Sequence, residues 1–273
     1  MFDLNYQTNA IMGNQQQMNA NFNNLQNQFT PGYKSESVNF SEALNQSMGG
    51  HGATFRSNGI VFSQGQIVRT ASPTDLAING NGFFLVNDGR TNHYTRDGRF
   101  VMRDGFLVHG PTNMKVQGYA MDEYGNISGQ MQPISLNLDP ATKLYGGKYT
   151  SYHFDESGKL YGEMVTTDTL TRQTIVSSVP LYQAAIGSFA NPSGLQKSGL
   201  TTFMESENSG GAVVGVAGQG ALGQVSPQSL EMANVDYARE AAALGQARMN
   251  YNANFASFRA MDKMQENAIG LIK

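Results

Sequence analysis

Apolar side chains recur at steps of four and three along the N-terminal segment of the chain. The repeat passes through Leu4, Ile11, Met18, Phe22, Leu25 and Phe29, with Thr8 and Gln15 at its polar positions. This heptad spacing is typical of a helix that packs against another helix. Thr30-Pro31-Gly32 then ends the pattern, because proline and glycine stop helices. We therefore expect a helix over residues 4–29, although Asn and Gln dominate its composition.

The same spacing returns at the other end of the chain. Its apolar positions include Leu244, Tyr251, Phe255, Phe258 and Ile269. Asn234 or Asp236 can cap the start of this second helix, because either side chain can accept hydrogen bonds from the first free N–H groups. Two heptad helices at the ends of one chain favour pairing with each other, with neighbouring chains, or with both.

Two charged residues, Arg248 and Asp262, also fall on the C-terminal seam. They lie either at the edge of the seam, where it drifts round the helix, or within it. In the second case they form a polar device that fixes the register of packed helices.

The middle of the chain has the pattern of an antiparallel β region. Between residues 76 and 119, short strand-like runs occupy 83–86, 93–96, 99–102 and 106–108. Asp-Gly pairs follow or separate these runs and supply the positive φ angles that tight hairpins need. A second β segment covers 126–205. The Gly-rich, weakly patterned stretch 206–230 is interpreted as a linker.

The order helix, β, β, linker, helix predicts an α+β fold. In this prediction the N- and C-terminal heptad helices pair as an α-helical, coiled-coil-like domain, and the middle region is mainly antiparallel β. The predicted segments are the N-terminal helix at 1–34, a β-rich domain at 35–125, a second β segment at 126–205, the linker at 206–230 and the C-terminal helix at 231–273.

Composition narrows the function classes. Charged residues make up 14% of the 273 residues, against roughly 25% in a typical soluble protein, and a weakly charged surface suits close subunit packing. The net charge of −3 gives no footprint for nucleic acid. No apolar run approaches the ~20 residues that span a bilayer, so we expect no direct membrane insertion. The first 25 residues lack a basic start and an apolar stretch, so we expect no cleaved signal peptide.

Candidate chemistry is sparse. The absence of cysteine excludes disulfides, thiol catalysis and cysteine metal sites. The run Gly218–Gly223 fits a dinucleotide-loop pattern, but Pro227 follows closely and no βαβ unit surrounds it. The four histidines are scattered, and no Gly-x-Ser-x-Gly elbow exists. The sequence thus predicts no enzyme, with no catalytic, cofactor-binding or metal-binding residues.

Three blocks of sequence carry a resemblance. The first contains Asn23-Asn24-Leu25 followed by Thr30-Pro31-Gly32-Tyr33-Lys34. The second contains Gly80-Asn81-Gly82-Phe83-Phe84, with Tyr94-Thr95-Arg96-Asp97-Gly98-Arg99-Phe100 after it. The third contains Asn191-Pro192-Ser193-Gly194-Leu195 and ends on Asn234-Val235-Asp236. In this order and spacing, the blocks resemble those of the flagellar rod and hook proteins, over most of the chain.

The resemblance implies a structural subunit of the bacterial flagellar axial structure, above all of the basal-body rod. Such a subunit leaves the cell through the flagellar type III export apparatus and polymerises into a hollow helical tube. The tube spans the periplasm, transmits torque and conducts exported subunits. The implied partners are copies of the chain, other axial proteins of the rod and hook, and the export apparatus. A short hook subunit is the alternative within the family.

In this family the terminal helices form the inner wall of the tube. The resemblance therefore places the assembly interface at Leu4, Ile11, Met18, Phe22, Leu25, Leu244, Tyr251, Phe255, Phe258 and Ile269. A hypothesis from a different class is an extracellular β-rich adhesin or carbohydrate-binding protein. That class permits a Gly-rich β protein with 12 tyrosines but does not require heptads at both termini.

Overall fold

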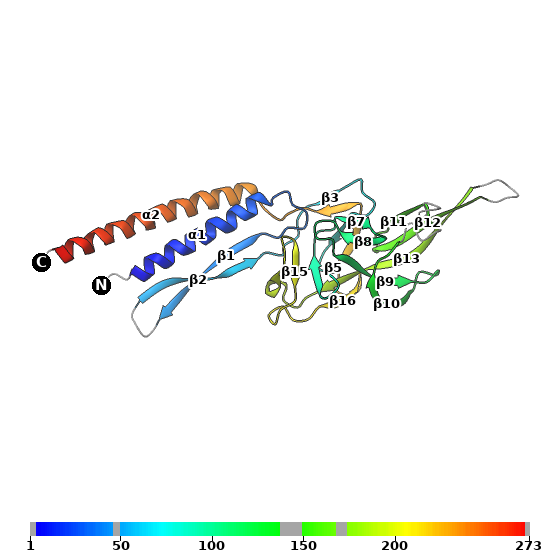
Figure 1. Ribbon diagram of the computed structural model, residues 1–273, viewed down its shortest axis with the longest axis horizontal. Helices are drawn as coiled ribbons and strands as arrows, with labels where there is room; N and C mark the ends of the chain where they lie inside the picture. The colour runs from blue at the N-terminus through cyan, green and yellow to red at the C-terminus, as the bar shows by residue number, and fades with distance from the viewer. Residues whose placement is uncertain (1–3, 46–49, 137–148, 168–173, 271–273) are drawn as a thin grey trace. The chain divides into compact units, whose positions relative to one another are not determined.

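The computed structural model describes the whole chain except residues 1–3, 46–49, 137–148, 168–173 and 271–273 (Figure 1). Its described part contains two α-helices, α1 (Leu4–Gln26) and α2 (Tyr237–Gly270), and one 3-10 turn at Pro192–Gly194. Both α-helices lie where the heptad spacing predicts them. Of the two possible caps, Asp236 starts α2, because its Oδ1 accepts a hydrogen bond from the Arg239 N–H at 3.2 Å. Neither helix is apolar enough over a sufficient length to cross a membrane.

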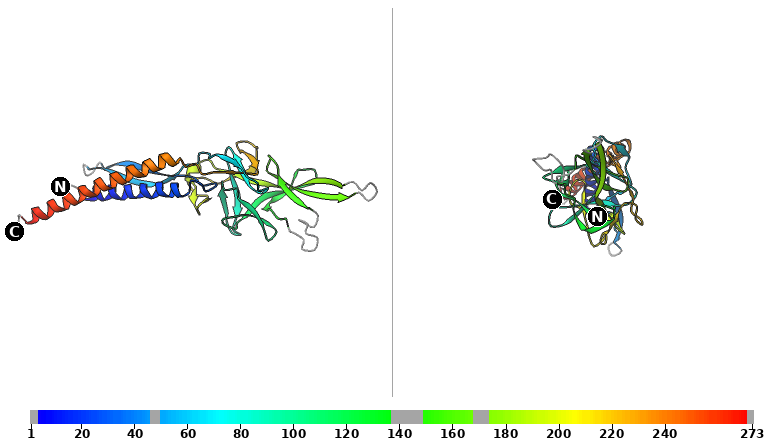
Figure 2. Two further views of the ribbon diagram at one scale, coloured as in Figure 1. Left: turned by 90° about the horizontal axis from the view of Figure 1, so that it is seen from above. Right: turned by 90° about the vertical axis from the view of Figure 1, so that its right-hand side faces the viewer.

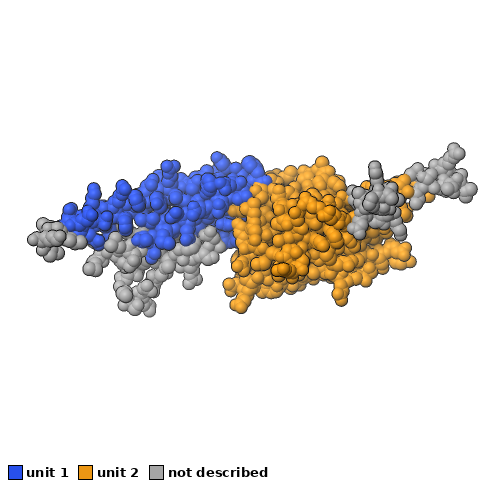
Figure 3. Space-filling view, in the orientation of Figure 1, with its two compact units in different colours: residues 1–29, 34–62, 234–273 blue, residues 30–33, 63–233 orange. Residues whose placement is uncertain are grey.

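The chain divides into two compact units (Figure 3). Unit 1 comprises residues 1–29, 34–62 and 234–273. Unit 2 comprises residues 30–33 and 63–233. Each unit therefore combines segments that are far apart in the sequence, and each has its own packing.

Unit 1 contains both helices and one antiparallel hairpin, β1 (Glu36–Asn45) with β2 (Gly50–Ile60). The hairpin register starts at Glu36 opposite Ile60 and shifts once, between Val38 and Asn39. Helix α1 contacts β1, β2 and α2. Figures 1 and 2 show α1 and α2 side by side, with α2 continuing beyond the first turn of α1.

Unit 2 is built on an antiparallel sheet of twelve strands. The main path runs through β11 (Ser151–Phe154), β12 (Lys159–Thr167), β13 (Thr174–Ser188), β9 (Lys115–Met121), β5 (Phe83–Asn87), β6 (Asn92–Thr95), β15 (Thr202–Met204) and β14 (Gln196–Lys197). The other four strands branch from it: β10 (Ile127–Pro133), β16 (Val213–Val216), β7 (Phe100–Arg103) and β8 (Phe106–His109). Strands β5 to β8 lie within one residue of the predicted runs.

Two small sheets complete unit 2. They pair β17 (Gln224–Pro227) with β4 (Leu76–Asn79), and β18 (Ser229–Glu231) with β3 (Ile67–Arg69). The stretch 206–230, expected as a linker, thus holds three strands. Its apolar residues explain this, because Val225 is buried in the core of unit 2 and β16 pairs with β13.

The core of unit 2 lies between these strands. Phe84 and Phe100 meet edge-on with ring centroids 5.1 Å apart. The other buried members include Leu76, Ile78, Val86, Leu107, Val116, Ile134, Leu160, Ala184 and Ile186. They come from strands that are distant in sequence, so the sheet and its core form together.

The predicted fold class is wrong. The described residues hold only two α-helices beside a large antiparallel sheet, and the helices form no coiled-coil-like domain of their own. Unit 1 also contains the β1–β2 hairpin, which packs on α1. The physical reason lies in the side chains that α1 buries. These are small or amide residues, whereas Phe22 and Phe29 on the heptad seam are 52% and 77% exposed. A coiled coil needs the seam residues as its buried knobs.

Candidate assembly surface

Helix α1 buries a face that the heptad seam does not occupy. The buried residues are Gly13, Asn14, Ala20, Asn21 and Asn24. At 3.6 residues per turn, this face lies about 120° round the helix from the seam. The seam residues Ile11, Met18 and Leu25 are only half-buried. The apolar stripe of α1 is therefore only partly covered within unit 1, with Phe22 its exposed member.

The predicted seam residues of α2 differ in how far they are buried. Leu244, Tyr251 and Phe258 are half-buried, whereas Phe255 is 40% exposed. The Phe255 ring is held in place from both sides along the helix. It stacks on Tyr251 at 6.2 Å with 5° between the ring planes, and the Arg259 guanidinium lies 4.9 Å from its centroid. Phe255 is thus a supported aromatic side chain that points away from the packed face.

A groove of about 570 Å³ lies between the two helices. Its lining residues are Met18, Asn19, Phe22, Leu25, Tyr237, Ala241, Leu244, Gly245 and Arg248. Phe22 and Tyr237 are 52% and 61% exposed, so the groove presents aromatic surface to solvent. Apolar patches of this kind mark interaction surfaces.

The groove brings together four of the predicted interface residues, Met18, Phe22, Leu25 and Leu244. Tyr251, Phe255 and Phe258 follow further along α2, and Ile11 lies further along α1. Leu4 and Ile269 belong to the helices, but their side chains lie outside the described residues. The interface itself remains a prediction, because the structure contains a single chain.

Two asparagines of the family motifs fasten unit 1. Asn24 is fully buried and makes two hydrogen bonds with the backbone of Glu36, donating to its carbonyl at 2.8 Å and accepting from its N–H at 2.9 Å. Asn234 accepts from the Ser35 N–H and donates to the Val61 carbonyl, both at 2.8 Å. Only a side-chain amide offers a donor and an acceptor in this way. These residues connect the ends of the hairpin to the helical segments.

Two motif glycines allow close approach of the backbone in unit 2. Gly32 has φ +69°, and a Cβ placed on it would lie 2.2 Å from the Asp97 nitrogen. Gly82 has φ +127°, and its Cβ would lie 2.4 Å from a methyl carbon of Ile186. Gly80 also has a positive φ, 106°. No other residue fits the first two positions without a shift of the neighbouring chain.

Three aromatic motif residues are structural. Phe83 packs edge-on against Phe189 and Phe203, with centroids 5.9 and 6.2 Å away. Tyr33 is fully buried, and the Lys197 ammonium lies 5.3 Å from its ring centroid. Phe84 belongs to the core already described, and the exposed Asn23 offers its carbonyl to the end of α1.

A buried ionic network crosses unit 2, and sequence reasoning missed it. The guanidinium of Arg96 lies 3.1 Å from the carboxylate of Glu231 and donates to the Gly80 carbonyl at 2.7 Å. Glu231 also accepts from the Gly65 N–H at 2.9 Å. Burial lowers the pKa of Arg96, and the Glu231 carboxylate opposes that shift. Arg96 and Glu231 are 135 residues apart in the sequence, so the pair joins distant parts of unit 2.

Asp97 forms the second half of this network. Arg99 donates to both of its carboxylate oxygens, at 2.9 and 2.6 Å, and His109 Nε2 lies 3.2 Å from Oδ2. Burial opposes the charged form of Asp97, but the hydrogen bonds and charges of Arg99 and His109 outweigh it, so the pKa of Asp97 lies below its ordinary value. The motif Thr95–Phe100 therefore encodes charge pairing inside the sheet.

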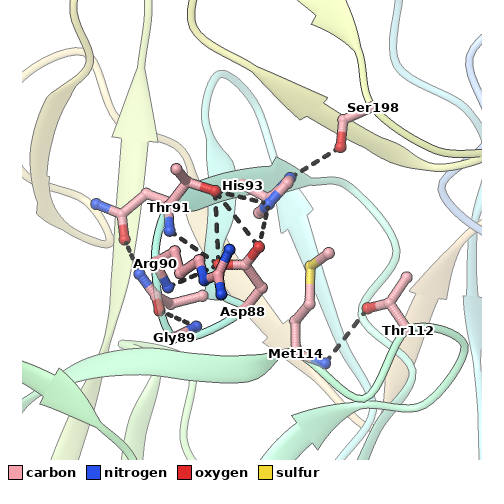
Figure 4. A network of polar contacts seen from close by, with 10 residues as sticks. Asp88, Gly89, Arg90, Thr91, His93, Thr112, Met114 and Ser198 are labelled. Atoms are coloured by element: carbon pink, nitrogen blue, oxygen red, sulfur yellow. Dashed lines mark hydrogen bonds and ion pairs between the residues drawn. The ribbon is translucent and has the colours of Figure 1, made fainter.

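A row of polar side chains links the turn after β5 to the segment after β14 (Figure 4). The Ser198 hydroxyl lies 2.9 Å from His93 Nδ1, and His93 Nε2 lies 3.5 Å from Asp88 Oδ2. Hydrogen bonds from the N–H groups of Thr91 and then Arg90 lower the pKa of Asp88 to about 2. The order Ser, His, Asp is that of a hydrolytic triad.

The backbone around this row gives it a structural role. A hydrolase needs free N–H donors next to its nucleophile to stabilise an oxyanion. Here the N–H groups of Ser198 and Gly199 both donate to the Thr202 carbonyl, at 2.9 and 3.2 Å. The row therefore acts as a clasp between two parts of the sheet. The described residues also hold no cluster of three or more His, Cys, Asp or Glu side chains able to bind a metal ion.

Comparison with known proteins connects these features to a family. The model of the flagellar hook protein FlgE/F/G D1 domain matches residues 77–162, within unit 2. The flagellar basal-body rod protein FlgG of Bacillus subtilis is 28% identical over 268 residues, which cover 91% of this chain and 90% of the relative. The chain is similar to flagellar rod and hook proteins. The resemblance read from the three motif blocks is thereby confirmed.

Two further relatives, one rod protein and one hook protein, have similar identity and coverage. FlgG of Borreliella burgdorferi is 26% identical over 264 residues, covering 89% of this chain and 88% of the relative. The flagellar hook protein FlgE of the same organism is 22% identical over 430 aligned positions, covering 96% and 97%. The chain thus resembles rod and hook proteins along nearly its whole length.

Proposed function

We propose that the chain is a structural subunit of the bacterial flagellar axial structure, a rod subunit that polymerises through the helices of unit 1. The observation that carries this proposal is the partly covered apolar seam of α1. Met18, Phe22 and Leu25 line a groove instead of a core. Removing apolar surface from water contributes roughly 25 cal/mol per Å², so contact with a neighbouring subunit would be stabilising.

Alignment length favours a rod subunit over a hook subunit. Four FlgG relatives align over 264 to 272 residues, close to the 273 of this chain. The FlgE of Helicobacter pylori is longer, because the match covers 68% of this chain but only 26% of the relative. A short hook subunit is the second candidate, supported by the FlgE relatives. An adhesin gains no support from relatives that are rod and hook proteins.

The finer parts of the proposal follow from the same role. We infer a structural protein and not an enzyme. The Ser198–His93–Asp88 row and the buried charges of Arg96 and Asp97 bond to groups within the sheet, which gives them a structural role. The subunit would pass through the flagellar type III export apparatus. It would then join copies of itself and other axial proteins in the periplasm-spanning basal body, in a hollow tube that transmits torque.

The test is complementation followed by isolation of basal bodies. A strain that lacks the gene is expected to lose motility and regain it with an epitope-tagged copy. Immunogold labelling of detergent-extracted basal bodies should place the tag on the rod. Label on the hook would favour the second candidate. A motile deletion strain, or tag recovered only from the cell envelope without basal bodies, would contradict an axial role.

A further inference from the structure

The exposed stripe of α2 carries three side chains at heptad spacing. Arg248, Phe255 and Asp262 follow one another at steps of seven, so they lie on one line along the helix. All three are exposed. The described residues contain no ion pair for Arg248 or for Asp262. The stripe therefore presents a cation, an aromatic ring and an anion, and the cation and the anion form no ion pair among the described residues.

The groove continues the same line towards the start of α2. Ala241, seven residues before Arg248, lines the groove, and Arg248 is the one charged residue among its described lining. The groove thus has a small side chain at Ala241, which leaves a hole, and the positive charge of Arg248 seven residues later. Further along the stripe, the ring of Phe255 is followed seven residues later by the negative charge of Asp262. The distance from Ala241 to Arg248 therefore matches that from Phe255 to Asp262, at about 10.5 Å each for a rise of 1.5 Å per residue.

Gly245 keeps this hole open. It lies within α2, beside Ala241 and Leu244 in the groove lining, and a Cβ placed on it would meet nothing within 4 Å. A glycine inside a helix costs about 1 kcal/mol relative to alanine. No neighbour among the described residues explains why glycine stands here instead of alanine. A side chain that enters the groove from another molecule would explain it.

We propose that the groove is occupied by α2 of a second copy of the chain, parallel and displaced by fourteen residues, or about 21 Å. This single displacement places Phe255 of the second copy over Ala241 and Gly245. It also places Asp262 of the second copy beside Arg248. Charge complementarity and shape select the same register. The inference rests on the proposed function, since it names the partner of the groove.

The displacement also fits polymer growth. One copy offers its groove and the next offers the far half of its α2, so the contact joins two different surfaces. A contact of this kind leaves a free groove at one end and a free ring and carboxylate at the other. It can therefore be repeated without closing into a dimer. Asp262 is available for it, because the side chains from Asp262 to Asn267 are all exposed, beyond the last half-buried residue, Met261.

Charge exchange tests the register. Arg248→Asp and Asp262→Arg are each expected to reduce the amount of chain in isolated basal bodies by about tenfold or more, because each puts like charges in contact. In the double variant Arg248→Asp/Asp262→Arg, position 248 of one copy again meets the opposite charge at position 262 of the next copy. Incorporation should therefore recover to near the wild-type level. Incorporation of either single variant at the wild-type level would overturn the proposal, and so would failure of the folded double variant to recover.

Filling the groove provides an independent test if a charge variant fails to fold. A Cβ at position 245 meets nothing within 4 Å among the described residues, so Gly245→Leu should keep or raise the helicity of the purified chain, yet lose incorporation. Ala242→Leu adds a similar volume at an exposed position outside the groove and is the matched control. Normal incorporation of Gly245→Leu would refute the proposal. Absence of the wild-type chain from basal bodies would instead refute the proposed function.

Discussion

Removing the Glu231 carboxylate should destabilise unit 2 more than any surface change. The side chains of Arg96 and Glu231 are 6% and 0% exposed and lie 3.1 Å apart. In Glu231→Ala, Arg96 keeps its bond to the Gly80 carbonyl but loses its counter-charge, and the Gly65 N–H loses its acceptor. Breaking a buried pair from one side costs about 3–5 kcal/mol. That is a large part of the roughly 5–15 kcal/mol that stabilises a typical protein.

Urea unfolding of the full chain, followed by tyrosine fluorescence, measures this cost. The chain has 12 tyrosines and no tryptophan, so the tyrosine signal is not masked. With a slope of about 2 kcal/mol per M, the midpoint should fall by roughly 1.5–2.5 M. Glu207→Ala, at an exposed position in the same unit, should change the free energy of unfolding by less than about 0.5 kcal/mol. A shift of less than 1 kcal/mol for Glu231→Ala, by the same assay, would refute a structural role for the pair.

Three further outcomes are expected. Gly32→Ala should lower the free energy of unfolding by at least about 2 kcal/mol more than Gly218→Ala. The two positions have similar φ, +69° and +74°, but only Gly32 faces backbone within 4 Å. Equal shifts of the melting temperature in the two variants would contradict this. Asp97 has a lowered pKa, so its contribution to stability is present above the ordinary value of 3.8 and is lost as pH falls through the lowered one. Acid titration should therefore show a shallower loss of stability in Asp97→Asn, and an unchanged slope would count against the network. Asn24→Ala loses two buried hydrogen bonds and should cost about 2 kcal/mol in unit 1, whereas the exposed Asn23→Ala should cost little; amide hydrogen exchange distinguishes them.

Local signals in the sequence were sufficient for the strands of the meander. Gly89 and Gly105 have φ of 100° and 76°, as their Asp-Gly turns require, and the runs beside them became β5 to β8. A hairpin is fixed by residues that are adjacent in the chain, so its pattern can be read directly. The cap of α2 is also local, since Asp236 bonds to a residue only three positions on, and Asp236 was one of the two caps that the sequence predicts.

The packed face of α1 could not be predicted in this way. The heptad rule assumes that apolar residues are the buried ones. In α1 the buried face is formed by residues such as Gly13, Ala20 and Asn24, because the β1–β2 hairpin packs on the helix and Asn24 bonds to its first strand. That hairpin lies outside the repeat. The seam was therefore identified correctly as a pattern, but its partner within the chain was not.

The buried charges were missed for a related reason. Arg96 and Glu231 are 135 residues apart, and each by itself resembles a solvated charge. Their places within motif blocks were the only available signal. The Ser198–His93–Asp88 row had no sequence signal, because Ser198 lies 105 residues from His93.

Incorporation into basal bodies tests the central claim most directly. Cells that lack the gene would carry wild-type chain, Leu25→Asp or Gln26→Asp, and the amount of each chain in isolated basal bodies and in the medium would be measured. Leu25 lines the groove, whereas its neighbour Gln26 is exposed and lies outside it. We expect wild-type chain and Gln26→Asp in the rod of motile cells, and Leu25→Asp exported but absent from basal bodies. Leu25→Asp present in the rod at the wild-type level, in motile cells, would contradict assembly through these helices.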